Sequence, residues 1–226
     1  MASGVGHHVA GQALWVFNSE MSQSSGRWTP PGQTSRRVDE DWYARELGED
    51  VFSRVEFVDC DLTEVSSVGT TFSECAFRNV AFNVSRHSVS SFVNCTFTRC
   101  NFFDAAFVGC KVLGSAFDRC DFRLTRIDGG NWSLVRMRGA ALSTAVFTGV
   151  RMIEADLSSA LIQNGTLRDC DLKGTDWHGA NLSGADLRGS DLSSLDPAVV
   201  QLKGALVTGQ QAVVVAQLLG LVVEPD

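Results

Sequence analysis

Nearly every fifth residue between Phe52 and Leu192 is apolar, most of these residues are large, and the register never slips. The series has 29 positions, of which 27 are apolar, and its two polar members are Ser67 and His87. A period of five that persists for about 140 residues indicates a repeat architecture, and this reading takes precedence over any assignment of single helices or strands.

A second register confirms the period. From Val55 to Ser190, the residue two positions before each member of this series is Val, Cys, Thr, Ser, Ala or Gly, and the other three positions are mostly polar or Gly. The unit is therefore small-polar-large-polar-polar, with two residues facing inward and three facing outward. All seven cysteines fall in the small register: Cys60, Cys75, Cys95, Cys100, Cys110, Cys120 and Cys170.

Five residues per side and four sides give a coil of 20 residues, and consecutive coils are expected to stack at about 4.8 Å, the spacing of neighbouring strands. About seven coils would form a rod of roughly 35 Å over residues 51–195. The prediction is an all-β fold, a quadrilateral parallel β-helix whose interior holds columns of residues 20 apart, such as Phe57, Phe77 and Phe97.

The flanking segments differ in composition. Residues 1–38 are rich in Gly, Ser, Gln, Thr and Pro and are predicted to be a flexible tail. Residues 39–50 are predicted to cap the N-terminal end of the coil, with Asp39 starting a short helix that carries Trp42 and Leu47.

Residues 196–226 are predicted to be a short α/β module that caps the other end and dimerises. Strands are expected at 205–207 and 221–223, with a helix from about Gln210 to Leu219 that Thr208 caps and Gly220 ends. The helix is apolar nearly all round, which is typical of a buried helix. Since the coil end covers one face, the other predicts a two-fold homodimer. The predicted interface residues are Leu206, Val213, Val214, Ala216, Gln217, Leu218 and Leu221.

Composition excludes several classes. The net charge of −7 disfavours a simple nucleic-acid binder, and no direct DNA binding is expected. No 18-residue apolar run or secretory signal is visible, so we expect a cytoplasmic protein without a membrane span. The cysteines show no C-x-x-C spacing and are expected to be buried free thiols, and no metal, cofactor or nucleotide motif appears.

The segments Ala180-Asn-Leu-Ser-Gly, Ala185-Asp-Leu-Arg-Gly and Ser190-Asp-Leu-Ser-Ser resemble the pentapeptide-repeat family, which forms right-handed quadrilateral β-helices. Within it, the chain is similar to the mycobacterial-type (Mfp) and Qnr-like fluoroquinolone-resistance proteins. The break at Ser85-Arg-His-Ser and the tail from Asp196-Pro-Ala-Val-Val onward carry this likeness. The resemblance implies a homodimeric mimic of B-form DNA that binds DNA gyrase, inhibits it and protects it from quinolones.

The charge distribution locates the candidate partner surface. The coil has 16 acidic and 14 basic residues, but the stretch from Glu154 to Asp191 has a net charge of −4 and adjoins the predicted dimer module. The stretch from Arg78 to Arg151 has ten basic and four acidic residues, which departs from a uniform DNA mimic. The candidate acidic residues are Glu154, Asp156, Asp169, Asp171, Asp176, Asp186 and Asp191.

Ser67 and His87 lie 20 residues apart, so they are expected to stack on adjacent coils. A serine beside a histidine suggests a hydrolase, but no carboxylate falls in that column and an inward position offers no substrate pocket. We therefore expect no catalytic residues. Three interpretations stay open: a gyrase-binding DNA mimic, a repeat scaffold with another partner, and, with the least support, an enzyme.

Overall fold

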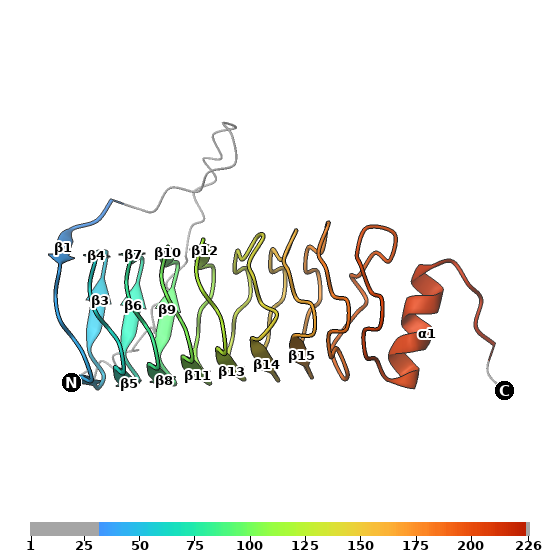
Figure 1. The fold of residues 1–226 in the computed structure, drawn as a ribbon, viewed down its shortest axis with the longest axis horizontal. Helices are drawn as coiled ribbons and strands as arrows, with labels where there is room; N and C mark the ends of the chain where they lie inside the picture. Colours follow the sequence, from blue (N-terminus) through green and yellow to red (C-terminus); the bar gives the residue numbers. More distant parts are fainter. Residues whose placement is uncertain (1–31, 225–226) are drawn as a thin grey trace, which may run out of the picture.

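The computed structural model describes residues 32–224, which wind into a parallel β-helix with one helix at its C-terminal end (Figure 1). Most of the predicted tail, residues 1–31, lies outside the described residues. Stacked partners are 20 residues apart, as in the pairing of Phe57 with Phe77 and of Phe77 with Phe97. This confirms the predicted all-β coil of 20 residues.

Three of the four sides contain parallel sheets. The Phe57 side, along the top of Figure 1, is a five-stranded sheet in the order β1-β4-β7-β10-β12. The Ser67 side, along the bottom, is seven-stranded in the order β15-β14-β13-β11-β8-β5-β2, and the Phe52 side contains β3-β6-β9. On the Leu62 side, single bridges such as Asp61 to Ala81 take the place of strands.

The strands are short because each side has only five residues. On the Phe57 side they are β1 (Ser35–Val38), β4 (Val55–Val58), β7 (Ala76–Arg78), β10 (Thr96–Thr98) and β12 (Ala116–Asp118). On the Ser67 side they are β2 (Glu46–Leu47), β5 (Ser66–Val68), β8 (Arg86–Ser88), β11 (Ala106–Val108), β13 (Arg126–Asp128), β14 (Val146–Thr148) and β15 (Thr166–Arg168). On the Phe52 side they are β3 (Val51–Ser53), β6 (Thr71–Ser73) and β9 (Ser91–Val93).

Aromatic columns fill the interior of the N-terminal half. Phe57, Phe77, Phe97 and Phe117 form one stack, with ring centroids 4.9, 4.8 and 4.7 Å apart. Each fully buried Phe contributes on the order of 1.5–3 kcal/mol. The small register lets these rings meet, and its cysteines are free thiols, buried except for the half-buried Cys120. Both expectations for the core are confirmed.

The corners of the coil require a left-handed residue. The residue two positions after the large one has positive φ in coil after coil, for example Gly69 at 72° and Asn79 at 53°. Gly and Asn adopt this conformation readily, whereas Val84 and Val89, at 59° and 46°, do so at a steric cost. These two valines flank strand β8, which carries His87.

The N-terminal cap differs from the expected short helix. Residues 35–50 are in the register of the coil, because β1 pairs with β4, β2 pairs with β5, and Asp41 bridges to Asp61. Trp42 occupies a large inward position, is 3% exposed and lies 5.6 Å from the rings of both Phe52 and Phe57. Burying this indole beneath the phenylalanine columns explains why the segment coils.

At the other end, the register also continues beyond residue 195. Val200 is buried, and bridges join Asn181 to Gln201 and Asp186 to Leu206. The strand expected at 205–207 is therefore reduced to one bridge, and residues 221–223 form none. Parallel stacking continues wherever the backbone of the preceding coil is open, which accounts for the extension.

Helix α1 (Gly209–Leu218) follows, close to its predicted limits. Thr208 is its N-cap, as predicted, and Gly220 takes a φ of 83° just after its end. Gln211 is its one buried residue, so the expectation of a buried helix is wrong for the single chain. The helix covers the coil end with one face, and the other meets solvent.

Gln211 completes the last turn of the coil. Its Nε2 donates to the carbonyl oxygens of Leu187 and Ser190, both at 2.7 Å, and its Oε1 accepts from the backbone N–H of Thr208 at 2.8 Å. The backbone groups of the last coil have no further coil to pair with, and an unpaired buried polar group is costly. One glutamine amide thus replaces part of a missing strand.

We expect Gln211→Met to lower the free energy of unfolding by about 2–4 kcal/mol, because the thioether keeps the side-chain length but leaves buried carbonyls unpaired. Urea unfolding followed by circular dichroism would measure this. The matched control is Gln210→Met on the exposed part of the same helix, which should change stability little. Equal effects of the two changes would contradict the capping role of Gln211.

Candidate functional site

The predicted acidic residues are first of all turn residues. Five of them precede a large inward residue and accept the backbone N–H of the residue two positions ahead, as Asp176 does from His178 at 2.9 Å and Asp191 from Ser193 at 2.8 Å. The other three are Asp156, Asp171 and Asp186. Asn101, Asn131 and Asn181 make the same bond, so the turn needs the oxygen and does not need the charge.

The coil brings some of these acids together. Asp156 and Asp176 are bridged on neighbouring coils of the Phe57 side. Asp171 and Asp191 are stacked in the same way on the adjoining Phe52 side, where the N–H of Asp191 bonds to the oxygen of Cys170 at 2.9 Å. Glu154 lies exposed near the corner between these sides. These five residues therefore form one acidic surface across two adjacent sides.

The remaining two acids lie elsewhere. Asp169 and Asp186 are on the Ser67 side, among arginines. Arg188 Nη2 is 2.7 Å from Asp186 Oδ2, and Arg168 Nε is 3.9 Å from it. Hydrogen bonds from Arg188 hold the pKa of the Asp186 carboxyl below its usual value. This carboxylate is therefore neutralised within the chain and adds little to a negative surface.

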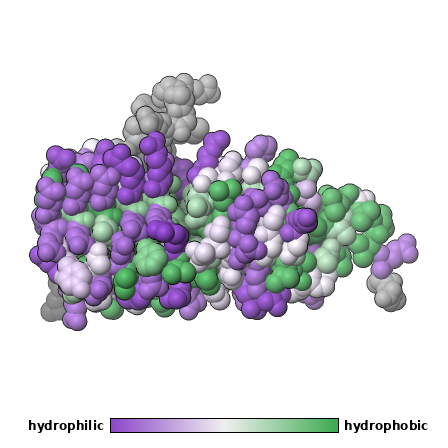
Figure 2. Space-filling model, viewed as in Figure 1, coloured by the Kyte–Doolittle hydropathy of each residue, from purple (hydrophilic) through white to green (hydrophobic). Residues whose placement is uncertain are grey.

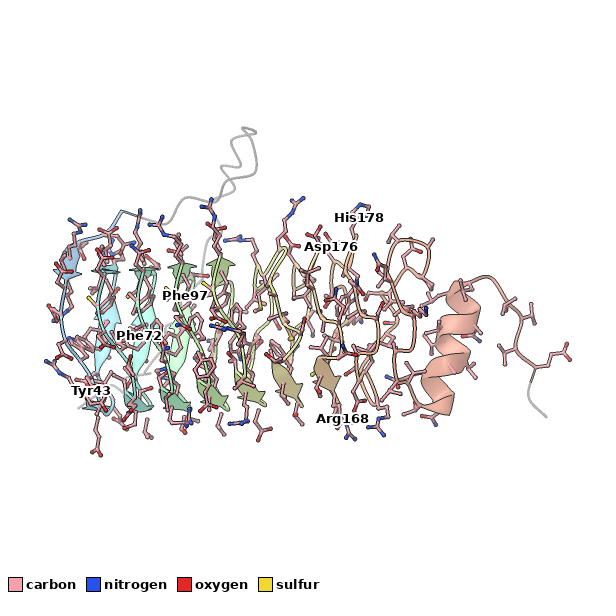
Figure 3. All side chains as sticks on the ribbon, in the orientation of Figure 1. Tyr43, Phe72, Phe97, Arg168, Asp176 and His178 are labelled. Atoms are coloured by element: carbon pink, nitrogen blue, oxygen red, sulfur yellow. The ribbon has the colours of Figure 1, made fainter. Side chains whose placement is uncertain are left out.

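One acid was missed by the sequence reasoning. Asp196 follows Asp176 by 20 residues, is exposed, and accepts the N–H of Ala198 at 2.9 Å. Within the described chain, no bridge or backbone hydrogen bond joins Asp196 to Asp176, so the acids that are stacked on the Phe57 side are Asp156 and Asp176. The five-residue register contained this signal, but the repeat was expected to end at residue 195. Figure 3 shows Asp176 on the top side and Arg168 on the opposite side.

Hydrogen bonding from Ser193 is the main cause that lowers the pKa of the Asp191 carboxyl, and nearby Lys173 lowers it further. Asp191 is therefore ionised at neutral pH. Lys173 reduces the negative charge of the acidic surface on the Phe52 side, and so does Arg151, which bridges to Asp171 on the neighbouring coil.

The basic middle of the coil is partly neutralised. Asp104 pairs with both Arg86 and Arg126, at 3.4 and 3.1 Å, and Arg123 lies 2.6 Å from Asp121. Arg123 also lies over the ring of Phe103, 5.6 Å from its centroid. Solvated ion pairs within the chain account for these arginines, so no binding partner is needed to explain them.

The apolar surface gathers at the C-terminal end, which is the green end of the molecule in Figure 2. Among the predicted interface residues, Leu206 and Leu221 are 51% and 60% exposed, and Leu218 is 41% exposed. Val213 and Gln217 are also exposed, and Val214 and Ala216 are half-buried. A groove of about 290 Å³ between the coil and the helix is lined by Leu192, Leu202, Ala205, Val207, Ala212, Val215, Ala216, Leu219 and Leu221.

Ser67 and His87 stack on adjacent coils, as predicted. Ser67 Oγ is 2.7 Å from His87 Nδ1, and Ser85 Oγ is 3.1 Å from Nε2, so both ring nitrogens are hydrogen-bonded. Ser67 and His87 are each 1% exposed, and the imidazole packs 4.9 Å from the ring of Phe107. A substrate cannot reach this pair, which gives it a packing role.

Within residues 32–224, no group of three or more His, Cys, Asp or Glu side chains could hold a metal ion. In the same residues, no helix is both long and apolar enough to cross a bilayer.

Comparison with known proteins identifies the repeat. The family model for pentapeptide repeats matches residues 166–196. Two trypsin-treated variants of QnrB1, a plasmid-mediated fluoroquinolone resistance protein, share this fold. Both are 21% identical, with TM-scores of 0.54 and 0.52, and the matches cover 86% and 85% of this chain and 99% and 97% of the other. No curated protein sequence matches the chain at a significant level. Residues 166–196 therefore match pentapeptide repeats, and the chain has the fold of QnrB1.

We expect the buried imidazole to make stability depend on pH. Burial lowers the pKa of His87 to about 3, from an ordinary value of 6.5, so His87 is neutral in the folded state. Between these two values the unfolded chain binds the proton and the folded chain does not. The free energy of unfolding therefore falls as the pH falls from about 6.5 towards 3, by up to several kcal/mol for this group.

Urea unfolding between pH 4 and 7.5 would test this by comparing the wild type with His87→Phe, which keeps a ring on Phe107. The variant should be less stable at pH 7.5, because Ser67 and Ser85 lose a partner, and should depend less steeply on pH. His178→Gln on the exposed surface is the control. If His87→Phe leaves the pH dependence of the free energy of unfolding unchanged, His87 is not its cause.

Proposed function

We propose that this chain is a DNA-mimicking binding protein that occupies DNA gyrase, inhibits it and protects it from fluoroquinolones. The observation that supports this most is the match of its β-helix to QnrB1, a fluoroquinolone resistance protein, over 99% of the QnrB1 chain. An unbroken rod with flat sides offers an extended surface of the kind that a duplex presents. On this proposal the protein acts in the cytoplasm, together with gyrase.

The charge of the acidic surface supports mimicry near the C-terminal end only. At the corner between the Phe52 and Phe57 sides, one coil carries Glu154 and Asp156 and the next carries Asp171 and Asp176. Two acids per coil, at about 4.8 Å per coil, give one charge per roughly 2.4 Å. Duplex DNA carries one charge per about 1.7 Å. The local density, before Arg151 and Lys173 are counted, is thus within a factor of two of DNA.

A dimer through the C-terminal end would join two such surfaces. The exposed apolar residues of α1 and of the segment after it gather at the C-terminal end (Figure 2), and an apolar area of this kind is typical of a protein contact. A two-fold contact between copies would cover it and place the two acidic surfaces on either side of the axis. The proposed gyrase-binding surface is therefore centred on the dimer.

A pentapeptide-repeat scaffold for a different protein is the alternative. The observation that favours it is the charge in the middle of the coil, since the stretch from Arg78 to Arg151 contains ten basic and four acidic residues. A partner that reads the whole rod would meet both signs of charge. Gyrase activity separates the two proposals.

We expect the purified protein to inhibit gyrase supercoiling and to reduce fluoroquinolone-induced DNA cleavage, and we expect Asp171→Asn with Asp191→Asn to raise the inhibitory concentration about tenfold. Asparagine keeps the oxygen that the turn needs, as at Asn131 and Asn181, so the change removes charge and preserves the fold. A tenfold loss corresponds to about 1.4 kcal/mol of binding free energy.

The control is Asp41→Asn with Asp61→Asn, at the same turn position near the N-terminal end, where the carboxylates accept from Tyr43 and Thr63. It changes the net charge equally and should leave inhibition unchanged. If micromolar wild-type protein alters neither supercoiling nor fluoroquinolone-induced cleavage, the gyrase proposal is wrong and the scaffold alternative remains.

We expect Leu218→Asp with Leu221→Asp to halve the solution mass measured by light scattering, since both side chains are exposed in the single chain and would meet a partner in the dimer. Leu161→Asp, at a 44% exposed position on the Leu62 side, is the control and should leave the mass unchanged. A wild-type protein that is monomeric at tens of micromolar would overturn the proposed interface.

A further inference from the structure

A row of aliphatic side chains runs along the outside of the Phe52 side, in the middle of the rod. Its members lie one or two positions after the large inward residue on four consecutive coils, and we call them the apolar strip: Val93, Leu113, Leu134 and Ile153. Their coils are stacked directly, because the N–H of Asn94 bonds to the oxygen of Leu113 and the N–H of Leu134 bonds to the oxygen of Ile153, both at 2.9 Å. The strip is therefore continuous along the rod.

The coil itself does not require these side chains. Leu134 is 48% exposed, and the other three members are half-buried at outward positions. Leu134 also stands at a left-handed corner with a φ of 60°. Asn94 and Gly114 hold the same place on the two preceding coils, at 52° and 69°, with less steric cost. A leucine at a corner that suits Asn or Gly indicates a contact outside the coil.

Ser133 adds a polar group at the centre of the strip. It directly precedes Leu134 and is 8% exposed, and its Oγ forms no hydrogen bond within the described residues. A buried hydroxyl without a partner is costly. A backbone N–H or C=O of a segment lying on the strip would satisfy it. The strip therefore fits an apolar segment in an extended conformation, whose backbone groups are open.

The chain enters the coil on the same edge as the strip. Gln33 Nε2 donates to the oxygen of Glu74 at 3.3 Å, and the N–H of Thr34 bonds to the oxygen of Arg54 at 2.8 Å. Arg54 and Glu74 occupy the same corner as Leu134, four and three coils before it. The segment that precedes Gln33 is therefore attached close to the strip.

That preceding segment contains one run of five apolar residues, Ala13-Leu-Trp-Val-Phe17. Its neighbours are mostly polar or Gly. We propose that residues 13–17 dock on the apolar strip, so that the N-terminal segment of the chain covers the Phe52 side of its own coil.

The lengths agree with this assignment. The strip begins three coils beyond Gln33 and ends six coils beyond it, which is about 14 to 29 Å at 4.8 Å per coil. The 16 residues between Phe17 and Gln33 reach up to about 53 Å when extended at 3.3 Å each, so they span this distance with slack. Five extended residues cover about 13 Å, and the strip is about 14 Å long. Phe17 then lies near Val93, and Ala13 lies near Ile153.

A tethered segment suits this strip better than a separate molecule does. With a length of about 14 Å and a width of roughly 15 Å, the strip offers on the order of 200 Å², well below the roughly 800 Å² per partner of a standard interface. A segment attached by a short linker has an effective concentration on the order of millimolar, so a small contact is sufficient. The proposed dimer contact is at the C-terminal end of the rod and leaves the strip uncovered.

Methyl NMR of the full chain tests the contact directly, because the sequence has three isoleucines, Ile127, Ile153 and Ile162. Ile127 and Ile162 point inward, are each 1% exposed, and serve as internal controls. We expect nuclear Overhauser effects between the Ile153 δ1 methyl group and the ring protons of Trp15. Leu14→Ser with Trp15→Ser and Phe17→Ser should shift the Ile153 resonance and leave the other two in place.

An Ile153 resonance that this triple change leaves in place would overturn the proposal. If the resonance moves instead with protein concentration, a second copy covers the strip, and the proposal is equally wrong.

Proteolysis tests the strip from the other side. Chymotrypsin cleaves after accessible aromatic residues, and cleavage of a segment that opens and recloses quickly follows its open population. We expect Leu113→Ser with Leu134→Asn to speed cleavage after Trp15 and Phe17 about tenfold, which corresponds to about 1.4 kcal/mol of docking free energy.

The matched control is Val108→Ser with Val89→Asn, at the same two positions of the Ser67 side, where the valines are 49% and 69% exposed. It should cleave at the wild-type rate. Equal rates in the wild type and the strip variant, or an equal rise in the control, would contradict docking on the strip. Neither measurement uses gyrase, so this proposal and the proposed function succeed or fail separately.

Discussion

The structure depends on the parallel hydrogen bonding of each coil to the next. Every side contributes a few backbone donors and acceptors, and these meet their partners only if the chain returns to the same place after 20 residues. A single inserted residue would move inward side chains outward, because the alternation of faces has a period of two. The chain meets this requirement with one small residue, one large residue and one left-handed corner in each five.

The corners explain why the choice of residue at the outward positions is restricted. An Asp or Asn before the large residue holds the turn by accepting a backbone N–H, and the residue two places after it adopts positive φ. Acidic residues therefore recur for a local structural reason, whatever binds the surface. On the proposed function, the acidic residues that bind the partner are those gathered on neighbouring sides of the last coils, around Asp171, Asp176 and Asp191.

Much of the fold could be predicted because the signal is repeated some thirty times, so no single residue decides it. The ends could not be placed as well. Trp42 and Leu47 fit a helical spacing and the five-residue register equally, and the burial of Trp42 against the rings of Phe52 and Phe57 distinguishes the two. Gln211 carries no sequence signal at all, since its role depends on open carbonyls that appear only when the coil stops. Asp196 was within reach of the register, but Pro197 at the next large position had suggested that the repeat was over.

The regularity of the coil turns sequence number into surface position. Residues 20 apart are neighbours along the rod, and residues on either side of a large inward position lie on opposite edges of one side. Charge along the rod can therefore be read from the sequence, and the stacked pairs Asp156 with Asp176 and Asp171 with Asp191 place acidic residues on two adjacent sides of the last coils. The apolar C-terminal end and this acidic surface differ in kind: burial of apolar area resists salt, whereas attraction between exposed charges does not. A contact through the apolar end should therefore persist at salt concentrations that weaken binding through the acidic surface.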